Sequence, residues 1–224
     1  MRNKLLCGVA AVAITAVIGA NDVAAQPAGL FNWSGFYVGG HLGGGQARFD
    51  ATIIGPGVTT FNADNKPSGI VGGAHVGQNW QMNTFVYGWE ADISATDWQK
   101  SALGAANSQR LVTDVKLLAS LRARLGMSFD RTLFYATGGL AYIRSKFSVF
   151  TPSNAVNGKF NKFGGVAGLG VEWKQTQHLS WRLEGLWYIF DSSKNGLVNH
   201  DSTHTANIKL KDALVGRLGA TLHF

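Results

Sequence analysis

The sequence N-H-D-S-T-H at residues 199–204 contains the side-chain types that a serine nucleophile needs for catalysis. In an extended segment His200, Ser202 and His204 would share one face, and a histidine base activates a serine when a third group orients it. No orienting acid is evident on an adjoining strand, and histidines at this spacing are weak evidence for a metal or haem. We therefore predict a solvated polar loop here, with no catalytic residue, no metal site and no cofactor.

Charged residues elsewhere in the chain recur at alternate positions, the spacing of side chains on one face of a strand. Glu90 and Asp92 lie in one such segment, and Arg122 and Arg124 lie in the next. An unpaired charge in a low-dielectric interior is very costly, so side chains of opposite sign that face the inside of a fold must pair. We predict an internal salt-bridge network made of Glu90, Asp92, Lys116, Arg122, Arg124, Arg144, Glu172, Arg182, Glu184 and Arg217.

The elements that must position these residues are strands, because apolar and polar side chains alternate along most of the chain. The segment Leu133–Phe147 is ambiguous in face, but Arg144 and Lys146 favour its even positions as the polar face. The pattern predicts an all-β, up-and-down fold of eight antiparallel strands. The expected strands span Ser34–Arg48, Ile70–Gln81, Phe85–Thr96, Asp114–Phe129, Leu133–Phe147, Phe163–Lys174, Leu179–Phe190 and Thr205–Phe224.

The connections between these strands alternate in length. Residues 81–84, 129–132 and 175–178 form tight turns, whereas the joins near 50–67, 99–110, 150–160 and 191–204 are long and polar. Short turns on one side and long loops on the other are typical of transmembrane barrels, with the short side periplasmic.

The volumes of the side chains decide which face points inward. An eight-stranded barrel has an interior just wide enough for side chains to fill, and the apolar face holds too many tryptophans and leucines to fit there. The opposite face is rich in glycine, so we predict that the apolar side chains contact lipid and the polar ones fill the lumen. Aromatic residues beside the short turns would form a girdle at one membrane interface. These residues are Trp80, Phe85, Phe129, Trp173, Trp181 and Phe224.

The first residues predict export. Arg2 and Lys4 precede an apolar run too short to span a bilayer, and small residues follow it, so we predict a cleaved signal peptide at 1–25, a lead-in at 26–32 and the barrel at 33–224. The only cysteine, Cys7, lies in the signal, which leaves no disulfide or thiolate site in the mature chain. The formal net charge of +7 suits anionic lipid phosphates, and an exported protein is not expected to bind nucleic acid.

Several motifs resemble one family: W-S-G-F-Y-V-G-G near the start, G-Q-N-W-Q, F-Y-A-T-G-G-L-A-Y at 134–142, G-V-E-W at 170–173 and the terminal aromatic residue. They are similar to those of small outer-membrane immunogenic proteins and porin-family barrels of Gram-negative bacteria, related in architecture to OmpA-type barrels. The resemblance implies location in the outer membrane, with lipopolysaccharide and other lipids around the barrel. It also implies that the barrel-assembly machinery reads Leu218, Ala220, Leu222 and Phe224 as an assembly signal.

The resulting functional expectation is a non-enzymatic, structural barrel that supports the envelope and displays surface loops to host or environmental ligands. An eight-stranded barrel leaves little open cross-section, so a lumen closed by salt bridges is favoured over a channel. The alternatives are a narrow diffusion porin, an adhesin or haem-binding receptor that uses its loops and, more distantly, a lipid A deacylase.

Overall fold

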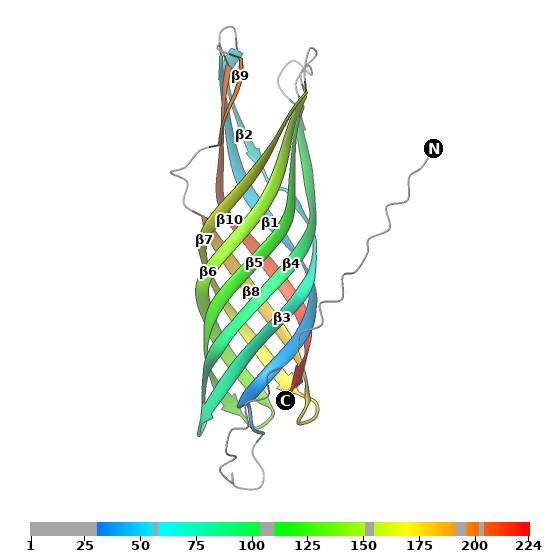
Figure 1. Ribbon diagram of the computed structural model, residues 1–224, viewed down its shortest axis with the longest axis vertical. Coiled ribbons are helices and arrows are strands. Elements are labelled where there is room, and N and C mark those ends of the chain that lie inside the picture. The colour runs from blue at the N-terminus through cyan, green and yellow to red at the C-terminus, as the bar shows by residue number, and fades with distance from the viewer. Residues whose placement is uncertain (1–30, 56–57, 104–109, 151–154, 191–195, 202–203) are drawn as a thin grey trace, which may run out of the picture. The chain divides into compact units, whose positions relative to one another are not determined.

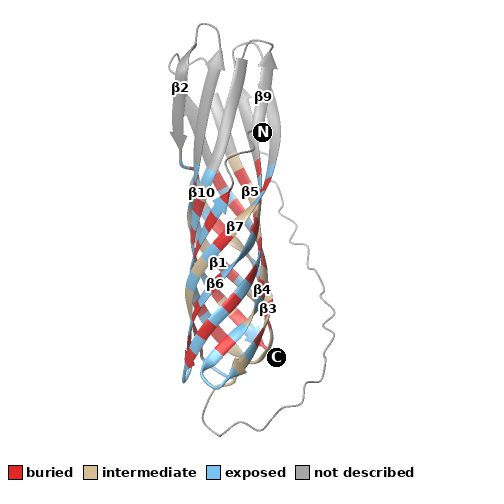
Figure 2. Cartoon of the chain, turned by 90° about the vertical axis from the view of Figure 1, so that its left-hand side faces the viewer, coloured by how far each residue is buried: buried red, intermediate tan, exposed pale blue. Residues whose placement is uncertain are grey.

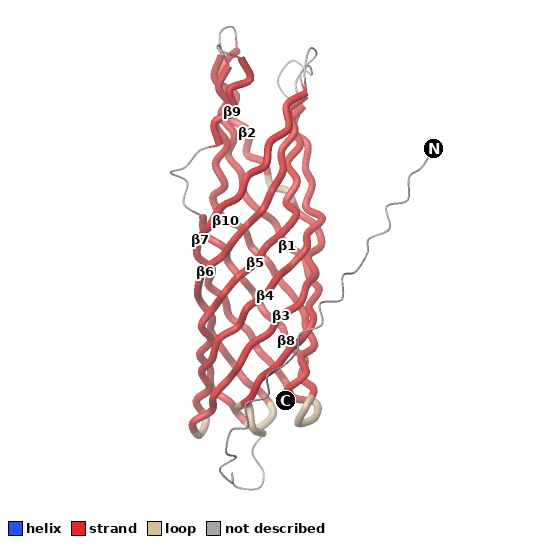
Figure 3. Tube along the Cα trace, in the orientation of Figure 1, coloured by secondary structure: helices blue, strands red, loops and turns tan. Residues whose placement is uncertain are grey.

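The computed structural model describes residues 31–55, 58–103, 110–150, 155–190, 196–201 and 204–224. Every regular element among these residues is a strand (Figure 3), and no helix within them is long and apolar enough to cross a bilayer. The predicted signal peptide at 1–25 and most of the lead-in lie outside the described residues. The strands are β1 (Gly35–Gly55), β2 (Val58–Asn65), β3 (Ser68–Met82), β4 (Phe85–Leu103), β5 (Arg110–Phe129), β6 (Thr132–Phe150), β7 (Ala155–Lys174), β8 (Leu179–Phe190), β9 (Gly196–Asp201) and β10 (His204–His223).

The strands form one closed antiparallel barrel (Figure 1). Consecutive strands pair from β3 to β8, and β1 closes the barrel between β10 and β3. The short strand β2 pairs with β1 on the same side as β3, and β9 pairs with β10 on the same side as β8. Thus β2 and β9 extend two existing positions around the barrel, and the prediction of an eight-stranded barrel is confirmed.

Two of the short turns contain only two residues each, 83–84 and 130–131. Asn83 and Asp130 have φ values of 55° and 49°, in the left-handed region that asparagine and aspartate tolerate better than most residues. In the third turn the Thr176 hydroxyl accepts hydrogen bonds from the backbone N–H of His178 and Leu179, at 3.3 and 3.0 Å. The tight turns are therefore where the sequence predicted them, at the end of the barrel that carries the C-terminus (Figure 1).

The opposite end differs from the prediction. The segments expected to be long loops are mostly strand, since β1 and β2 are separated only by residues 56–57 and β6 and β7 only by 151–154. The prediction of long loops there was wrong because antiparallel backbone hydrogen bonds continue where the apolar alternation stops, and they need no apolar side chain.

Exposure alternates along the strands, as Figure 2 shows for the lower part of the barrel. In β8 the side chains of Ser180, Arg182 and Glu184 are buried, and those of Trp181 and Leu183 are more than half exposed. The apolar face therefore points outward and the polar face inward, as the volume argument predicted.

Bulges change this alternation at one point. The register shifts in β4 between Ala95 and Trp98 and in β5 between Val115 and Leu117. As a result Val115 points inward and is fully buried, opposite Trp98, which continues the inward even positions of β4. Strict alternation along the predicted strand Asp114–Phe129 would place Val115 on the outer face with Leu121, but the bulge adds one residue and reverses the faces beyond it.

The predicted faces of β6 were also wrong. Leu133, Tyr135 and Ile143 are buried, whereas Phe134 and Leu140 are exposed, so the odd positions face the lumen. Arg144 and Lys146 favoured the opposite assignment because they lie beyond the apolar part of the strand, where an outward charge meets water rather than lipid.

Glycine makes room for long side chains in the lumen. A Cβ atom on Gly77 would lie 2.4 Å from the Tyr37 hydroxyl, whereas one on the outward-facing Gly185 would meet nothing within 4 Å. We expect Gly77→Ala to lower the free energy of unfolding by about 1–3 kcal/mol through overpacking. Gly185→Ala should leave it unchanged. The temperature at which gel mobility shifts from the folded to the unfolded form measures both, and equal effects would contradict this account.

Candidate functional site: an ionic layer inside the barrel

Four carboxylates and four guanidinium groups meet in the middle of the lumen, and each of these residues is at most 6% exposed. The structure brings together eight of the ten residues predicted for the network. They lie on β4, β5, β7, β8 and β10: Glu90, Asp92, Arg122, Arg124, Glu172, Arg182, Glu184 and Arg217. We call these eight residues the ionic layer.

Glu90 is the centre of the ionic layer. Arg182 donates to both of its oxygens, from Nη1 at 2.5 Å and from Nη2 at 3.0 Å. Arg122 also donates to Glu90, and the Tyr37 hydroxyl donates to Oε2 at 3.0 Å. Arg217 Nη2 lies 3.6 Å from Oε1. Charge-assisted and bidentate bonds of this kind are the strong ones, so Glu90 on β4 is tied through its partners to β1, β5, β8 and β10.

Asp92 and Glu184 extend the ionic layer towards the end of the barrel opposite the short turns. Arg217 bonds both of them, with Nη1 at 2.9 Å from Asp92 and Nε at 2.6 Å from Glu184. Glu184 also accepts from Arg122 Nη1 at 3.0 Å, and the Ser120 hydroxyl donates to Asp92.

Glu172 and Arg124 pair on the side of the short turns. Glu172 also accepts from the Ser180 hydroxyl and lies 3.1 Å from His223 Nε2. Every carboxylate in the ionic layer therefore has an arginine partner. The layer holds equal numbers of positive and negative groups and leaves no carboxylate unpaired to act as a general base.

Sequence reasoning missed two tyrosines that belong to this site. Tyr37 alternates with outward residues of β1, so its position could have been predicted from the same period. Tyr135 donates to Glu184 at 3.2 Å and its ring lies 3.8 Å below the guanidinium of Arg124. It was missed because the faces of β6 were assigned the wrong way round.

Two buried histidines, His41 and His75, lie beside the ionic layer. His41 and His75 approach each other at 3.4 Å between their Nδ1 atoms. Each has a hydroxyl partner, Ser94 for His41 and Thr221 for His75, at 2.8 and 3.0 Å.

Apolar side chains close the lumen on both sides of the ionic layer. Along β4 the order is Val86, then Glu90 and Asp92, then Trp98, all buried. Val86 belongs to a cluster near the short turns with Trp33, Leu133 and Tyr135. Trp98 belongs to a larger cluster towards the other end that also contains Ala47, Val71, Val115, Leu118, Ala141, Ile143, Val166, Leu186, Tyr188, Phe190, Ala213 and Val215.

Two predicted members lie outside the ionic layer. Arg144 is exposed on the outer face, so its assignment to the lumen was wrong. Lys116 lies at the β5 bulge, pairs with Asp114 at 2.7 Å and keeps 41% of its side chain exposed. Its assignment to the internal network was wrong because Lys116 is the extra residue of the bulge and therefore leaves the even-numbered lumen positions of β5.

The outer surface is an apolar belt. All six residues proposed for the aromatic girdle are more than a third exposed and lie beside the short turns or the C-terminus. On β10 the outward positions from Leu214 to Phe224 are apolar or glycine, and Asp212 follows above them. Ten residue steps span about 34 Å, which at the usual strand tilt gives a height of about 25 Å, the thickness of the apolar band of a transmembrane barrel. A soluble monomer does not expose such a continuous apolar surface. The fold and this surface define a transmembrane β-barrel.

Comparison with known proteins identifies the family. A family model described as outer membrane protein beta-barrel domain matches residues 11–211. The 31 kDa outer-membrane immunogenic protein of Brucella melitensis is 28% identical over 91% of this chain and 92% of its own length. The 22 kDa outer membrane protein of Rhizobium leguminosarum is 32% identical over 74% of this chain and 67% of its own. The chain belongs to the outer membrane β-barrel domain family and is an outer-membrane protein.

A solved structure shares the fold. The outer membrane protein OprG from Pseudomonas aeruginosa has a TM-score of 0.56 at 12% identity, covering 85% of this chain and 97% of that one. At this identity the likeness concerns the fold alone.

Two further predictions from the sequence concern the C-terminal residues and the N-H-D-S-T-H segment. Leu218, Leu222 and Phe224 face outward, and the backbone N–H of Phe224 donates to the Phe36 carbonyl at 2.9 Å. Their role as an assembly signal, with Ala220, stays a prediction. Of the N-H-D-S-T-H segment, Ser202 lies outside the described residues, and His200 and His204 lie in β9 and β10 rather than in a loop.

Proposed function

We propose that this protein is a non-conducting, non-enzymatic structural barrel of the outer membrane. The observation that carries the proposal is the charge-paired ionic layer between two apolar clusters. A structural barrel needs a filled, rigid interior, whereas a channel needs a continuous hydrated path.

The pairing explains why ions would be excluded. An ion that enters the lumen must separate buried pairs such as Glu90 with Arg182, and an uncompensated buried charge costs several kcal/mol. It must also cross the clusters around Trp33 and Trp98, whose mainly apolar side chains replace little of its hydration shell. Both barriers act in series along the same axis.

Planar-bilayer recording of the refolded mature chain tests the proposal. We expect no steady conductance above that of the protein-free bilayer, because both barriers are present in the folded state. Folding is verified beforehand by the heat-dependent shift in gel mobility. Stable channels of uniform size would overturn the proposal in favour of a narrow porin.

A further inference from the structure

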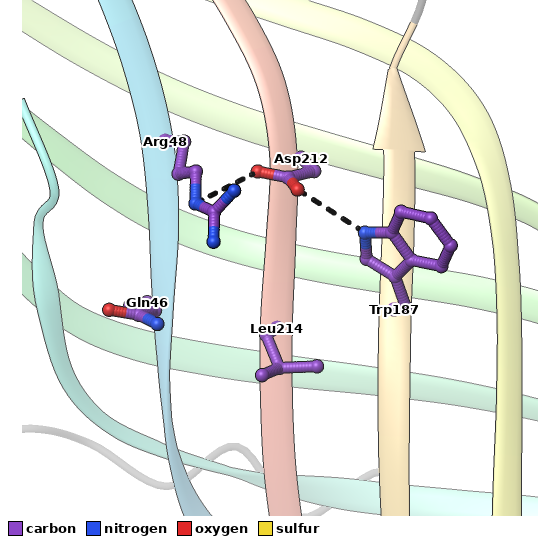
Figure 4. Close-up of a pocket in the computed structure, with 5 residues that line it drawn as sticks. All are labelled: Gln46, Arg48, Trp187, Asp212 and Leu214. Atoms are coloured by element: carbon purple, nitrogen blue, oxygen red, sulfur yellow. Dashed lines mark hydrogen bonds and ion pairs between the residues drawn. The ribbon is translucent and has the colours of Figure 1, made fainter. Parts of the chain in front are cut away.

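A pocket of about 340 Å³ lies on the outer surface, where β1, β10 and β8 leave the apolar belt. It is lined by Gln46, Arg48, Trp187, Asp212 and Leu214 (Figure 4). The pocket lies at the end of the apolar belt opposite the short turns. Because the short turns of such barrels are periplasmic, that end of the belt lies in the outer leaflet of the membrane, whose lipid is lipopolysaccharide.

The pocket has a charged upper rim, formed by Arg48 and Asp212, and an apolar floor, formed by Trp187 and Leu214. Arg48 keeps 55% of its side chain exposed, and its Nε lies 3.7 Å from the carboxylate of Asp212, which is too long for a tight pair. The indole N–H of Trp187 donates to the same carboxylate at 3.3 Å. Leu214 pairs across the strands with Trp187, and both are about half exposed. The guanidinium is thus oriented and still accessible to a ligand.

A second and a third cation flank Arg48. Gln46 pairs with Ser68 and Phe49 with Asn65, so the register places Lys66 across from Arg48. Lys211 is the extra residue of a bulge beside Asp212. Both lysines are exposed. Among the residues whose side chains the structure describes, Arg48, Lys66, Lys211 and Asp212 therefore lie together at the upper rim.

The surface below the pocket carries a row of three glycines. Gly44, Gly216 and Gly185 are neighbours across β1, β10 and β8, one outward position below the floor. A Cβ atom on Gly216 or Gly185 would meet nothing within 4 Å. An acyl chain that starts at the pocket can lie against the backbone along this row.

We propose that this pocket is a lipopolysaccharide site, in which Arg48 and Lys66 bind a lipid A phosphate and Trp187 and Leu214 contact the first carbons of an acyl chain. Arginine recognises phosphate through two parallel N–H donors, and tryptophan prefers the level of the membrane interface. Asp212 opposes the phosphate by charge and competes with it for Arg48.

Binding of bisphosphorylated lipid A to the mature barrel in detergent, counted by native mass spectrometry, tests the site. We expect Arg48→Gln to weaken binding about ten-fold, the scale of one charge-assisted contact. Asp212→Asn should strengthen binding several-fold, because it removes the competing carboxylate. Arg144→Gln is the matched control, since Arg144 is an exposed cation on the outer face of β6, away from the pocket, and it should have no effect.

The second arm of the binding experiment uses dephosphorylated lipid A. It should bind the wild-type barrel about ten-fold more weakly and should not distinguish wild type from Arg48→Gln. Each variant must keep the heat-dependent gel shift. Equal losses in Arg48→Gln and Arg144→Gln would overturn the site in favour of diffuse charge attraction. Weaker binding by Asp212→Asn would overturn direct contact in favour of a bridging cation. A dimer that Arg48→Gln abolishes would show that a second copy of the chain occupies the pocket.

Discussion

Replacement of Glu90 by glutamine is expected to lower the free energy of unfolding by about 3–5 kcal/mol. Glu90 accepts hydrogen bonds from Arg122, Arg182 and Tyr37, and Arg217 lies within ion-pair distance. Glutamine keeps the shape but not the charge, so the arginines around it lose their central counter-charge in a site with no access to water. Urea-induced unfolding of the barrel in lipid vesicles measures the change.

Asp114→Asn is the control for this experiment. It removes a carboxylate that also has a short ion pair, with Lys116 at 2.7 Å, but the lysine side chain is 41% exposed. Water replaces the lost partner there, and we expect a loss below about 1 kcal/mol. If the two variants lost equal stability, burial of the ionic layer would not be what makes Glu90 important.

The double variant Arg122→Ala/Arg124→Ala is expected to open the lumen. It leaves four carboxylates against Arg182 and Arg217, so the ionic layer acquires an excess of negative charge and must take up water and cations. We expect cation-selective current steps in planar bilayers, absent from the wild type, and a stability loss of at least about 3–5 kcal/mol.

A second double variant, Arg124→Ala/Glu172→Ala, separates the effect of charge from the effect of side-chain volume. These two residues pair with each other, so their joint removal also shortens two long side chains but keeps the charges of the layer balanced. We expect a smaller stability loss and no selective current. Equal currents from both double variants would show that side-chain volume closes the lumen and charge does not.

The sequence by itself determined the class of fold and the orientation of most faces. Alternation with a period of two is a local property, and residues such as Trp181 and Leu183 cannot fit inside a narrow barrel where Arg182 and Glu184 alternate with them. The two-residue turns were also local, since they depend on what Asn83 and Asp130 tolerate. All eight residues of the ionic layer followed from the period-two alternation and from the limited volume inside a narrow barrel.

Only the tertiary structure decided which of those residues meet. Arg182 contacts Glu90 across the lumen from a strand far away in the sequence, a pairing that depends on barrel closure and on the register of every strand between them. The bulge in β5 placed Val115 inside and moved Lys116 out of the network. Arg144 was misassigned because a charge beyond the apolar belt meets water on the outer face just as well as in the lumen. Register, bulges and membrane depth are set by contacts between distant strands and by the bilayer, and a pattern within one strand does not contain them.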